Sequence, residues 1–255
     1  MQVIIRDTEE EVARAAADIY GGYVKPGAVL GVATGSTPLA TYRELIRRHE
    51  NGDLDFADTQ MFALDEYAGL PREHEQSYYY TIRHEFSDHL NIAVEDVHVP
   101  DGTADDLVQA GKDYDAAIEK AGGIDIQLLG IGSNGHIGFN EPGSSLNSAT
   151  RPMALHPQTI KDNSRFFDSV EEVPRRCITQ GLGTIQRAGH LLLLATGEKK
   201  ADAVAKLVEG PLSASCPASI LQWHPKATVI VDAPAAAKLH NREYYAAAEN
   251  NEVPA

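Results

Sequence analysis

The stretch IQLLGIGSNGHIGFNEPGSS, residues 126–145, is the most informative part of this chain. It begins as an apolar run typical of a buried strand and then breaks into glycines. His136 follows the glycines, with Asn134 just before it and Glu141 separated from it by four residues. A buried strand that ends in a glycine loop brings such side chains to the sheet edge where open α/β folds bind ligands. One imidazole and one carboxylate held together there are suited to acid/base catalysis.

Other apolar runs of strand length alternate with segments of helical spacing along the chain. This alternation predicts an open, mainly parallel Rossmann-like α/β sheet with helices on both faces. No linker or repeat divides the chain, so residues 1–255 are expected to form a single α/β domain. The expected strands are 29–33, 60–64, 126–131, 190–195 and 228–232, and the expected helices are 37–50, 77–90, 104–121 and 198–209.

Composition and charge exclude several classes of protein. The formal net charge of -15 argues against nucleic-acid and anionic-membrane partners, since both require a basic surface. Cys177 and Cys216 are far apart and predict neither a disulfide framework nor a zinc site. The N-terminus turns acidic without an apolar core, and no run reaches the ~20 apolar residues of a spanning helix. We therefore expect a cytoplasmic protein.

Two segments repeat one pattern: an apolar strand, then Ala-Thr-Gly, then a helix start. They are VLGVATGSTP at 29–38 and LLLLATGEKK at 191–200. Right-handed crossovers place such turns on the same edge of a parallel sheet. The glycine loop after 126–131 and the LDEY segment after 60–64 fall on that edge too. The sequence therefore predicts that four turns rich in polar groups converge on one crevice.

The turn of Thr34, Gly35, Ser36 and Thr37 stands directly before Pro38, a residue that suits a first helical position. Ser36 or Thr37 suits the N-cap, and simple capping is one interpretation of this turn. The other is phosphate binding, because free N–H groups and the helix dipole attract anions. The spacing of a P-loop is missing.

Basic side chains elsewhere could balance the charge of a phosphate bound at this turn. Lys200 lies in the second Ala-Thr-Gly turn, and Arg165 lies in a long polar segment at about 145–185. That segment is interpreted as a mobile lid rather than a structural excursion, because long loops within compact domains are usually functional. Its prolines and its basic residues are Pro152, Pro157, Pro174, Arg151, Lys161, Arg165, Arg175 and Arg176.

Asp65 directly follows a buried strand and has two interpretations. A carboxylate at that place can act as a catalytic base, or it can merely cap the next turn. His136 and Glu141 could in principle form a metal pair, but there is no HExxH motif and their spacing does not put both on one helix face. We therefore expect no metal.

Taken together, these segments resemble the glucosamine-6-phosphate deaminase family. The matching pieces occur in family order from about residue 3 to 240. They are ATGSTPLATY, FALDEYAGLP, SYYYTIR, LLGIGSNGHIGFNEPGSSL, NSRFF, GLGTI, ATGEKKA and LQWHPKATVIVD. The resemblance implies a sugar-phosphate substrate and no cofactor. The implied reaction converts glucosamine 6-phosphate and water to fructose 6-phosphate and ammonia.

The resemblance also implies roles for individual residues. Asp65 matches the base that moves a proton between C2 and C1, and His136 matches the residue that opens the pyranose ring. Glu141 matches the carboxylate that orients this imidazole and favours its charged form. The turn 34–37, Arg165 and Lys200 match the phosphate contacts. Because Arg165 lies in the expected lid, its closure would be coupled to phosphate recognition.

Two positions depart from the common family pattern. Asn134 stands where many members have Asp, so it can orient His136 through a hydrogen bond but cannot hold charge. Met153 stands where regulated members tend to have Lys, while Arg151 remains. We therefore predict no activation by N-acetylglucosamine 6-phosphate. Family members are monomers or homo-oligomers, and the loss of this cation favours a monomer.

Two other functions are compatible with the same fold. A 6-phosphogluconolactonase typically continues its glycine motif as DGHTASLFP, where this chain reads NGHIGFNEP. A non-enzymatic sugar-phosphate sensor usually carries an added DNA-binding domain, for which this acidic chain has no room. The deaminase interpretation is therefore preferred to both.

Overall fold

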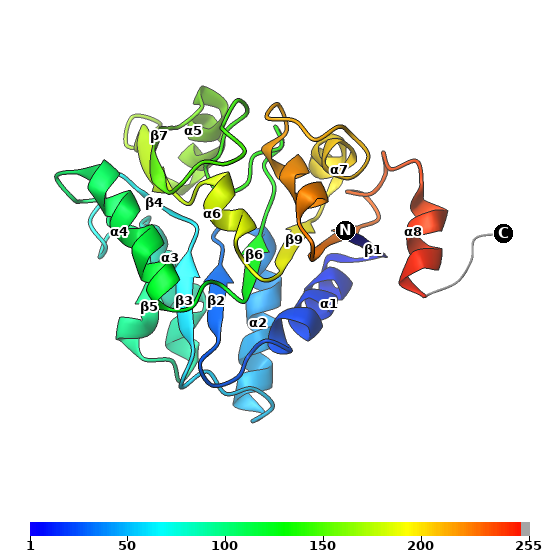
Figure 1. Cartoon of the computed structure of the whole chain (residues 1–255), viewed down its shortest axis with the longest axis horizontal. Helices are drawn as coiled ribbons and strands as arrows, with labels where there is room; N and C mark the ends of the chain where they lie inside the picture. Colours follow the sequence, from blue (N-terminus) through cyan, green and yellow to red (C-terminus); the bar gives the residue numbers. More distant parts are fainter. Residues whose placement is uncertain (251–255) are drawn as a thin grey trace.

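The centre of the structure, a computed structural model that describes residues 1–250, is a seven-stranded sheet (Figure 1). Its strand order is β1-β10-β9-β6-β2-β3-β5, and every neighbouring pair is parallel. The predicted open, mainly parallel α/β sheet is thus confirmed. The strand bounds are β1 Gln2–Arg6, β2 Val29–Val32, β3 Gln60–Ala63, β5 Val97–His98, β6 Ile126–Leu129, β9 Leu191–Ala195 and β10 Ala227–Asp232.

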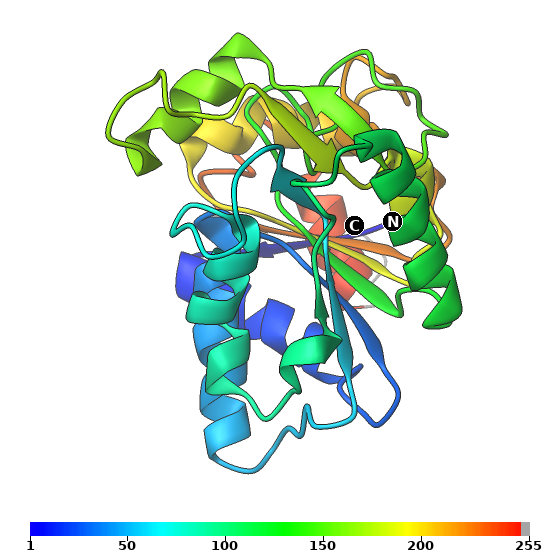
Figure 2. The same ribbon diagram turned by 90° about the vertical axis from the view of Figure 1, so that its left-hand side faces the viewer.

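Helices cover both faces of this sheet, as predicted. Helices α1, α2 and α3 pack on one face, and α4, α6 and α7 pack on the other (Figure 2). Successive strand side chains point to opposite faces of the sheet. Leu30 therefore belongs to the hydrophobic core under α1, α2 and α3, and Val29 to the core under α4, α6 and α7. The α-helices are α1 Glu9–Gly21, α2 Thr37–Glu50, α3 Tyr78–Glu85, α4 Leu107–Lys120, α5 Pro157–Asn163, α6 Leu182–Gln186, α7 Ala201–Val208 and α8 Arg242–Glu249.

Short 3₁₀ helices complete several connections. Two of the expected helices are interrupted by this tighter winding: 77–90 consists of α3 followed by η1, and 198–209 begins with η4. Among the described residues no helix has the length and apolarity needed to cross a membrane. The 3₁₀ helices are η1 Ser87–His89, η2 Val94–Asp96, η3 Ser164–Phe166, η4 Glu198–Lys200 and η5 Pro217–Trp223.

A second sheet of three short antiparallel strands lies beyond the carboxyl edge of the first (Figure 2). Its strands are β4 Asp65–Tyr67, β8 Arg176–Thr179 and β7 Arg151–Ala154, in the order β4-β8-β7. Thr179 is paired with Asp65 on one side and with Arg151 on the other. One end of the 145–185 segment, β8, is therefore paired with the strand that carries Asp65, and the other end, β7, is paired with β8. The part that projects is α5, η3 and the loop after them.

Candidate active site

Four turns lie together at the carboxyl edge of the parallel sheet, as predicted. They follow β2, β3, β6 and β9. Strands β2 and β6 are neighbours, but the chain proceeds from β2 towards β3 and β5, and from β6 towards β9 and β10. Such a switch point leaves a crevice between the diverging connections, and ligands of open α/β sheets bind there.

Asp65 is the first residue of β4 and is only 6% exposed. Burial, reinforced by the neighbouring Glu66 carboxyl, raises the pKa of Asp65 to about 8. The hydroxyl of Thr179 lies 3.5 Å from Oδ2 of Asp65, a distance too long to stabilise the charge strongly. Asp65 is therefore a carboxyl group that can take up and release a proton near neutral pH, which is what a general base requires.

Glu66 holds the strand that presents Asp65. Its carboxylate accepts hydrogen bonds from the backbone N–H groups of Tyr67, Tyr78 and Tyr79 at 2.8 to 2.9 Å. Burial raises its pKa, although these three donors oppose that effect. The donors at Tyr78 and Tyr79 belong to the first turn of α3, so Glu66 attaches this helix to β4 and fixes the strand in place.

The glycine loop after β6 lies directly against Asp65. Gly138 has a φ of 54°, and a Cβ added there would be 3.2 Å from Oδ2 of Asp65. The buried Asn140 attaches the loop to the second sheet, since its amide donates to the carbonyls of Ile137 and Gln180 at 3.1 and 2.8 Å. These contacts bring the loop that carries His136 and Glu141 next to Asp65, although Asp65 precedes His136 by 71 residues in the chain.

His136 and Glu141 form a close pair within this loop. Nδ1 of His136 lies 3.4 Å from Oε2 of Glu141, but the two groups are not aligned for a hydrogen bond. Burial alone would raise the pKa of Glu141, yet the nearby imidazole and hydrogen bonds from Thr159 and Asn134 lower it to about 2. Glu141 is therefore a permanent negative charge beside His136 at neutral pH.

Asn134 makes a hydrogen bond to His136, as the sequence predicts, but through the backbone of that residue. Its side-chain oxygen accepts from the backbone N–H of His136 at 3.1 Å, and its amide donates to Oε2 of Glu141 at 2.8 Å. Asn134 thus holds both the loop backbone at His136 and the carboxylate that faces the imidazole.

The turn before α2 presents unused donor groups. Ser36 occupies the N-cap position with helical backbone angles, and neither it nor Thr37 caps the helix by a side-chain hydrogen bond. The interpretation of this turn as a simple side-chain cap is therefore wrong. Gly35 has a φ of 97°, a conformation that favours glycine, and a Cβ added there would meet open space. The backbone N–H groups of Thr34, Gly35 and Ser36 donate to no other described residue, so they remain available for an anion.

Lys200 and Arg165 occupy different environments near this edge. Nζ of Lys200 donates to the carbonyl of Ile131 at 2.6 Å, so the lysine is held beside the glycine loop. Burial lowers its pKa; Asp162 opposes this effect and the charge of Arg165 adds to it. Arg165 is exposed, and its guanidinium lies 4.6 Å from the centre of the Phe166 ring. Lys200 is thus fixed in place, whereas Arg165 lies on the surface of the projecting segment.

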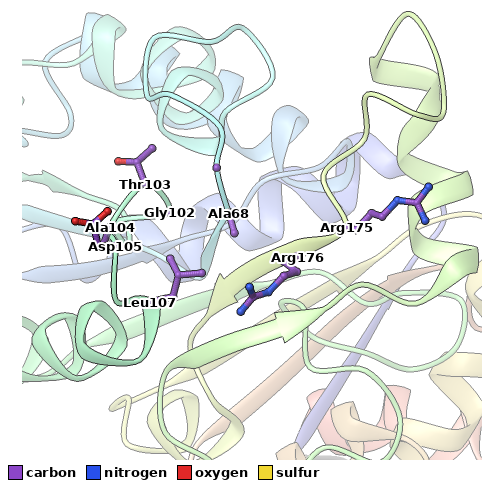
Figure 3. Close-up of a pocket in the computed structure, with 9 residues that line it drawn as sticks. Ala68, Gly102, Thr103, Ala104, Asp105, Leu107, Arg175 and Arg176 are labelled. Atoms are coloured by element: carbon purple, nitrogen blue, oxygen red, sulfur yellow. The ribbon is translucent and has the colours of Figure 1, made fainter.

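An open cavity of about 440 Å³ lies away from these residues (Figure 3). It is bounded by the loop after β4, the loop before α4 and the start of β8, where the side chains of Arg175 and Arg176 point in different directions. Exposed Asp105 also lines it, so its charges are mixed. None of the predicted site residues lines this cavity, and we do not assign the chemistry to it. Among the described residues, no three His, Cys, Asp or Glu side chains are grouped to hold a metal ion.

Known proteins resemble this chain over nearly its whole length. The family model for glucosamine-6-phosphate isomerases and 6-phosphogluconolactonases matches residues 2–230. The chain belongs to this family. It is 64% identical to a glucosamine-6-phosphate deaminase of Corynebacterium kroppenstedtii, covering 98% of this chain and 97% of that protein. Identity to a glucosamine-6-phosphate deaminase of Rhodococcus jostii is 55%, covering 96% and 95%.

Solved structures separate the two branches of the family. A monomeric glucosamine-6-phosphate deaminase superposes with a TM-score of 0.91 at 43% identity, covering 93% of this chain and all of that one. A 6-phosphogluconolactonase from Trypanosoma cruzi superposes with a TM-score of 0.74 at 21% identity, covering 94% and 97%. At that identity the lactonase shares the fold alone.

Several residues that build the site were not identified from the sequence. Thr179, Asn140 and Thr159 each contact a predicted catalytic residue or its loop. Asn140 belongs to the NGHIGFNEP piece, so its place within a dense motif could have marked it. Thr179 and Thr159 lie in no recognisable pattern, because their contacts are made across 114 and 18 residues of sequence.

Proposed function

We propose that this protein converts glucosamine 6-phosphate and water to fructose 6-phosphate and ammonia. The observation that carries the proposal is the buried Asp65 lying against the loop that holds the His136–Glu141 pair. One group that can act as a base next to one imidazole–carboxylate pair matches a reaction with two separate proton transfers. The near-full-length identity to deaminases supports the same reaction.

The first step opens the pyranose ring. His136 delivers a proton to the ring oxygen as the bond between C1 and that oxygen breaks, and it accepts the proton of the C1 hydroxyl. Imidazole suits this exchange because it can give and take a proton near neutral pH. Glu141 stays ionised, since its pKa is about 2, and its charge stabilises the imidazolium form during the transfer.

The second step moves a proton between neighbouring carbons. Asp65 removes the proton from C2 of the open-chain aldehyde while O1 takes up a proton from the neighbouring ammonium group of the substrate. Asp65 then delivers its proton to C1 of this enol-type intermediate, which leaves an iminium group at C2 and a hydroxyl at C1. Water then adds to C2 and ammonia leaves, giving fructose 6-phosphate. Burial raises the pKa of Asp65 to about 8. The ammonium group of the bound substrate would favour its ionised form, so the substrate itself prepares the base.

The phosphate group would hold the substrate between the sheet and the projecting segment. We infer that the N–H groups of the 34–37 turn bind the phosphate oxygens at the start of α2, where the helix dipole adds favourable potential. Lys200 supplies a fixed positive charge beside the glycine loop, and Arg165 supplies a second charge from the 145–185 segment. Arginine can bind phosphate through two parallel hydrogen bonds, so its engagement would draw that segment over the substrate as a lid.

The proposed reaction is tested by ammonia release from glucosamine 6-phosphate. The wild type should release ammonia and form fructose 6-phosphate in equal amounts. Asp65→Asn and His136→Gln should each lose roughly 10²- to 10⁴-fold in kcat while still binding substrate, as expected for general acid/base groups. Full turnover by Asp65→Asn would exclude the role assigned to it. Hydrolysis of 6-phosphogluconolactone without ammonia release would favour the lactonase instead.

We further propose that the protein acts as a monomer in the cytoplasm. The monomeric state of the deaminase with a TM-score of 0.91 supports the first part. The free thiols of Cys177 and Cys216 support the second part, because disulfides are rare in a reducing compartment. Light scattering of the purified chain should give one 27.6 kDa unit, and a stable larger species would contradict the proposed monomer.

A further inference from the structure

Helix α5 contacts the site through two side-chain hydrogen bonds. The Thr159 hydroxyl donates to Oε1 of Glu141 at 2.5 Å, and the Asn163 amide donates to the Tyr67 hydroxyl at 2.8 Å. Between them, Ile160 packs on the apolar cluster of Tyr67, Phe139, Leu155 and Cys177. The inner face of α5 is thus seated on the site by two hydrogen bonds and one apolar contact.

The two oxygens of Glu141 have separate partners. Oε2 faces Asn134 and His136, whereas Thr159 is the one donor to Oε1 among the described residues. Thr159 is 5% exposed, so water does not readily replace its hydroxyl. Asn134 donates to Oε2, so without a partner for Oε1 the carboxylate of Glu141 could still turn about its Cγ–Cδ bond relative to the imidazole. The hydroxyl on α5 removes that freedom.

The same segment carries a proposed phosphate ligand. Arg165 follows the end of α5 by two residues, within η3. A phosphate that engages Arg165 therefore favours the docked position of α5, in which the Thr159 hydroxyl reaches Glu141. Phosphate binding and the orientation of the ring-opening pair are connected through one short helix.

We propose that Thr159 is a positioning residue that couples phosphate engagement by the α5–η3 segment to the orientation of Glu141 beside His136. This inference rests on the proposed function of the site. It predicts that loss of the hydroxyl affects the ring-opening chemistry and leaves the binding of the sugar phosphate largely intact. It also predicts that the effects of Thr159 and Arg165 on kcat are not independent.

The test compares Thr159→Val with Thr159→Ser in the ammonia-release assay. Valine removes the hydroxyl and should lower kcat roughly 10- to 100-fold, the loss of a hydrogen bond to a charged group, while KM changes less than about threefold. Serine keeps the hydroxyl and should restore kcat to within about fivefold of the wild type. Should the valine variant fail to fold, Thr159→Ala removes the same hydroxyl and provides the same comparison.

A matched control separates this effect from a general loss of stability. Thr59 is also a buried threonine, 1% exposed, and its hydroxyl donates to the Phe56 carbonyl at 2.8 Å, remote from the site. Thr59→Val should lower the melting temperature and leave kcat unchanged. Equal losses of kcat in both valine variants, or full kcat in Thr159→Val, would overturn the inference.

A double-mutant cycle tests the coupling itself. Arg165→Ala should lower kcat in the wild-type background by more than it does in the Thr159→Val background, because the second variant has already lost the connection. Strictly additive losses would refute the coupling. An inactive wild type would instead refute the proposed function, so the two failures are distinguishable.

Discussion

Single residues at this site combine burial with incomplete pairing. Asp65 is buried beside a second carboxyl group and has one long side-chain contact, and Nδ1 of His136 is buried with no hydrogen-bond partner among the described residues. Both arrangements cost stability in the folded protein. Such a cost is expected where a group must exchange protons with a substrate rather than remain satisfied within the protein.

The raised pKa of Asp65 predicts a change of stability with pH. Its ordinary value is 3.8 and its folded value is about 8, so the stability associated with its protonated form is lost as the pH rises from about 4 to 8. Asp65→Asn cannot ionise. We expect its melting temperature to equal that of the wild type near pH 4 and to exceed it at pH 9, by an amount equivalent to a few kcal/mol. A constant difference across this range would exclude the raised pKa.

His136 and Glu141 should behave as one unit in kinetics. We expect Glu141→Gln and His136→Gln each to lower kcat strongly, and the double variant to be no slower than the slower single variant. The reason is that both substitutions impair the same proton transfer: Glu141→Gln removes the charge that supports the imidazole, and His136→Gln removes the imidazole itself. Steady-state ammonia release from the three variants measures this. Multiplying losses would show that the two residues act independently.

The proposed phosphate-binding residues lie on two kinds of element: connections of the parallel sheet and the projecting α5–η3 segment. Lys200 and the 34–37 turn belong to connections of the parallel sheet, whereas Arg165 belongs to η3 beyond α5. Buried strands on both sides fix the first group of residues. The second group depends on the contacts that α5 makes with the site. The position of Arg165 therefore depends on how α5 is seated on the site, whereas the position of Lys200 does not.

Arg165→Ala should raise KM for glucosamine 6-phosphate by roughly 10-fold or more, since a charged hydrogen-bonding partner of the phosphate is removed. Lys200→Ala should raise it similarly. Inhibition by inorganic phosphate should weaken in parallel. Arg175 provides the matched control, because it is an exposed arginine on the same segment that lines the separate cavity. Arg175→Ala should leave KM unchanged, and an equal increase there would remove the phosphate assignment of Arg165.

The elements also show how far the sequence alone determines this structure. The buried strands β2, β3, β6, β9 and β10 lie within two residues of the predicted ranges, because continuous apolar runs between turn residues are local signals. The first strand and helix were not predicted, although Thr8 and Glu11 form a capping box at the start of α1. That signal was present and could have been used.

The second sheet had no comparable local signal. All four residues of strand β7 are half-buried or exposed, so the strand shows neither a buried apolar run nor alternation. It forms because β8 provides a partner already attached to β4. The contacts of Thr179 and Thr159 depend on that sheet and on the docking of α5. Tertiary pairing of this kind leaves no pattern in a single sequence.

At the scale of the whole molecule, the topological switch point of the large sheet lies next to the second sheet, to which the 145–185 segment is attached through β7 and β8. Met153, on β7, packs against the apolar cluster of Tyr67, Phe139, Leu155 and Cys177. Arg151 beside it is half-buried and donates to the Asn140 side chain at 2.9 Å. In this chain Met153 thus serves in packing, and Arg151 helps to attach the glycine loop.

This arrangement predicts that the enzyme does not respond to N-acetylglucosamine 6-phosphate as an activator. A methionine in an apolar cluster cannot replace the ammonium group of a lysine at a phosphate site. The half-saturation concentration of substrate should be unchanged when the compound is added at concentrations that do not compete at the active site. A strong decrease of that concentration would contradict the prediction.

One bound amino-sugar phosphate is expected to contact Asp65, His136 and the phosphate-binding residues at the same time. A crystal structure with an unreactive, reduced open-chain analogue of glucosamine 6-phosphate would show whether it does. We predict the Asp65 carboxylate within hydrogen-bond reach of the C1 and C2 positions, His136 near the hydroxyl that derives from the ring oxygen, and the phosphate on the 34–37 turn with Lys200 and Arg165. An analogue whose phosphate lies elsewhere, or that reaches Asp65 without approaching His136, would contradict it.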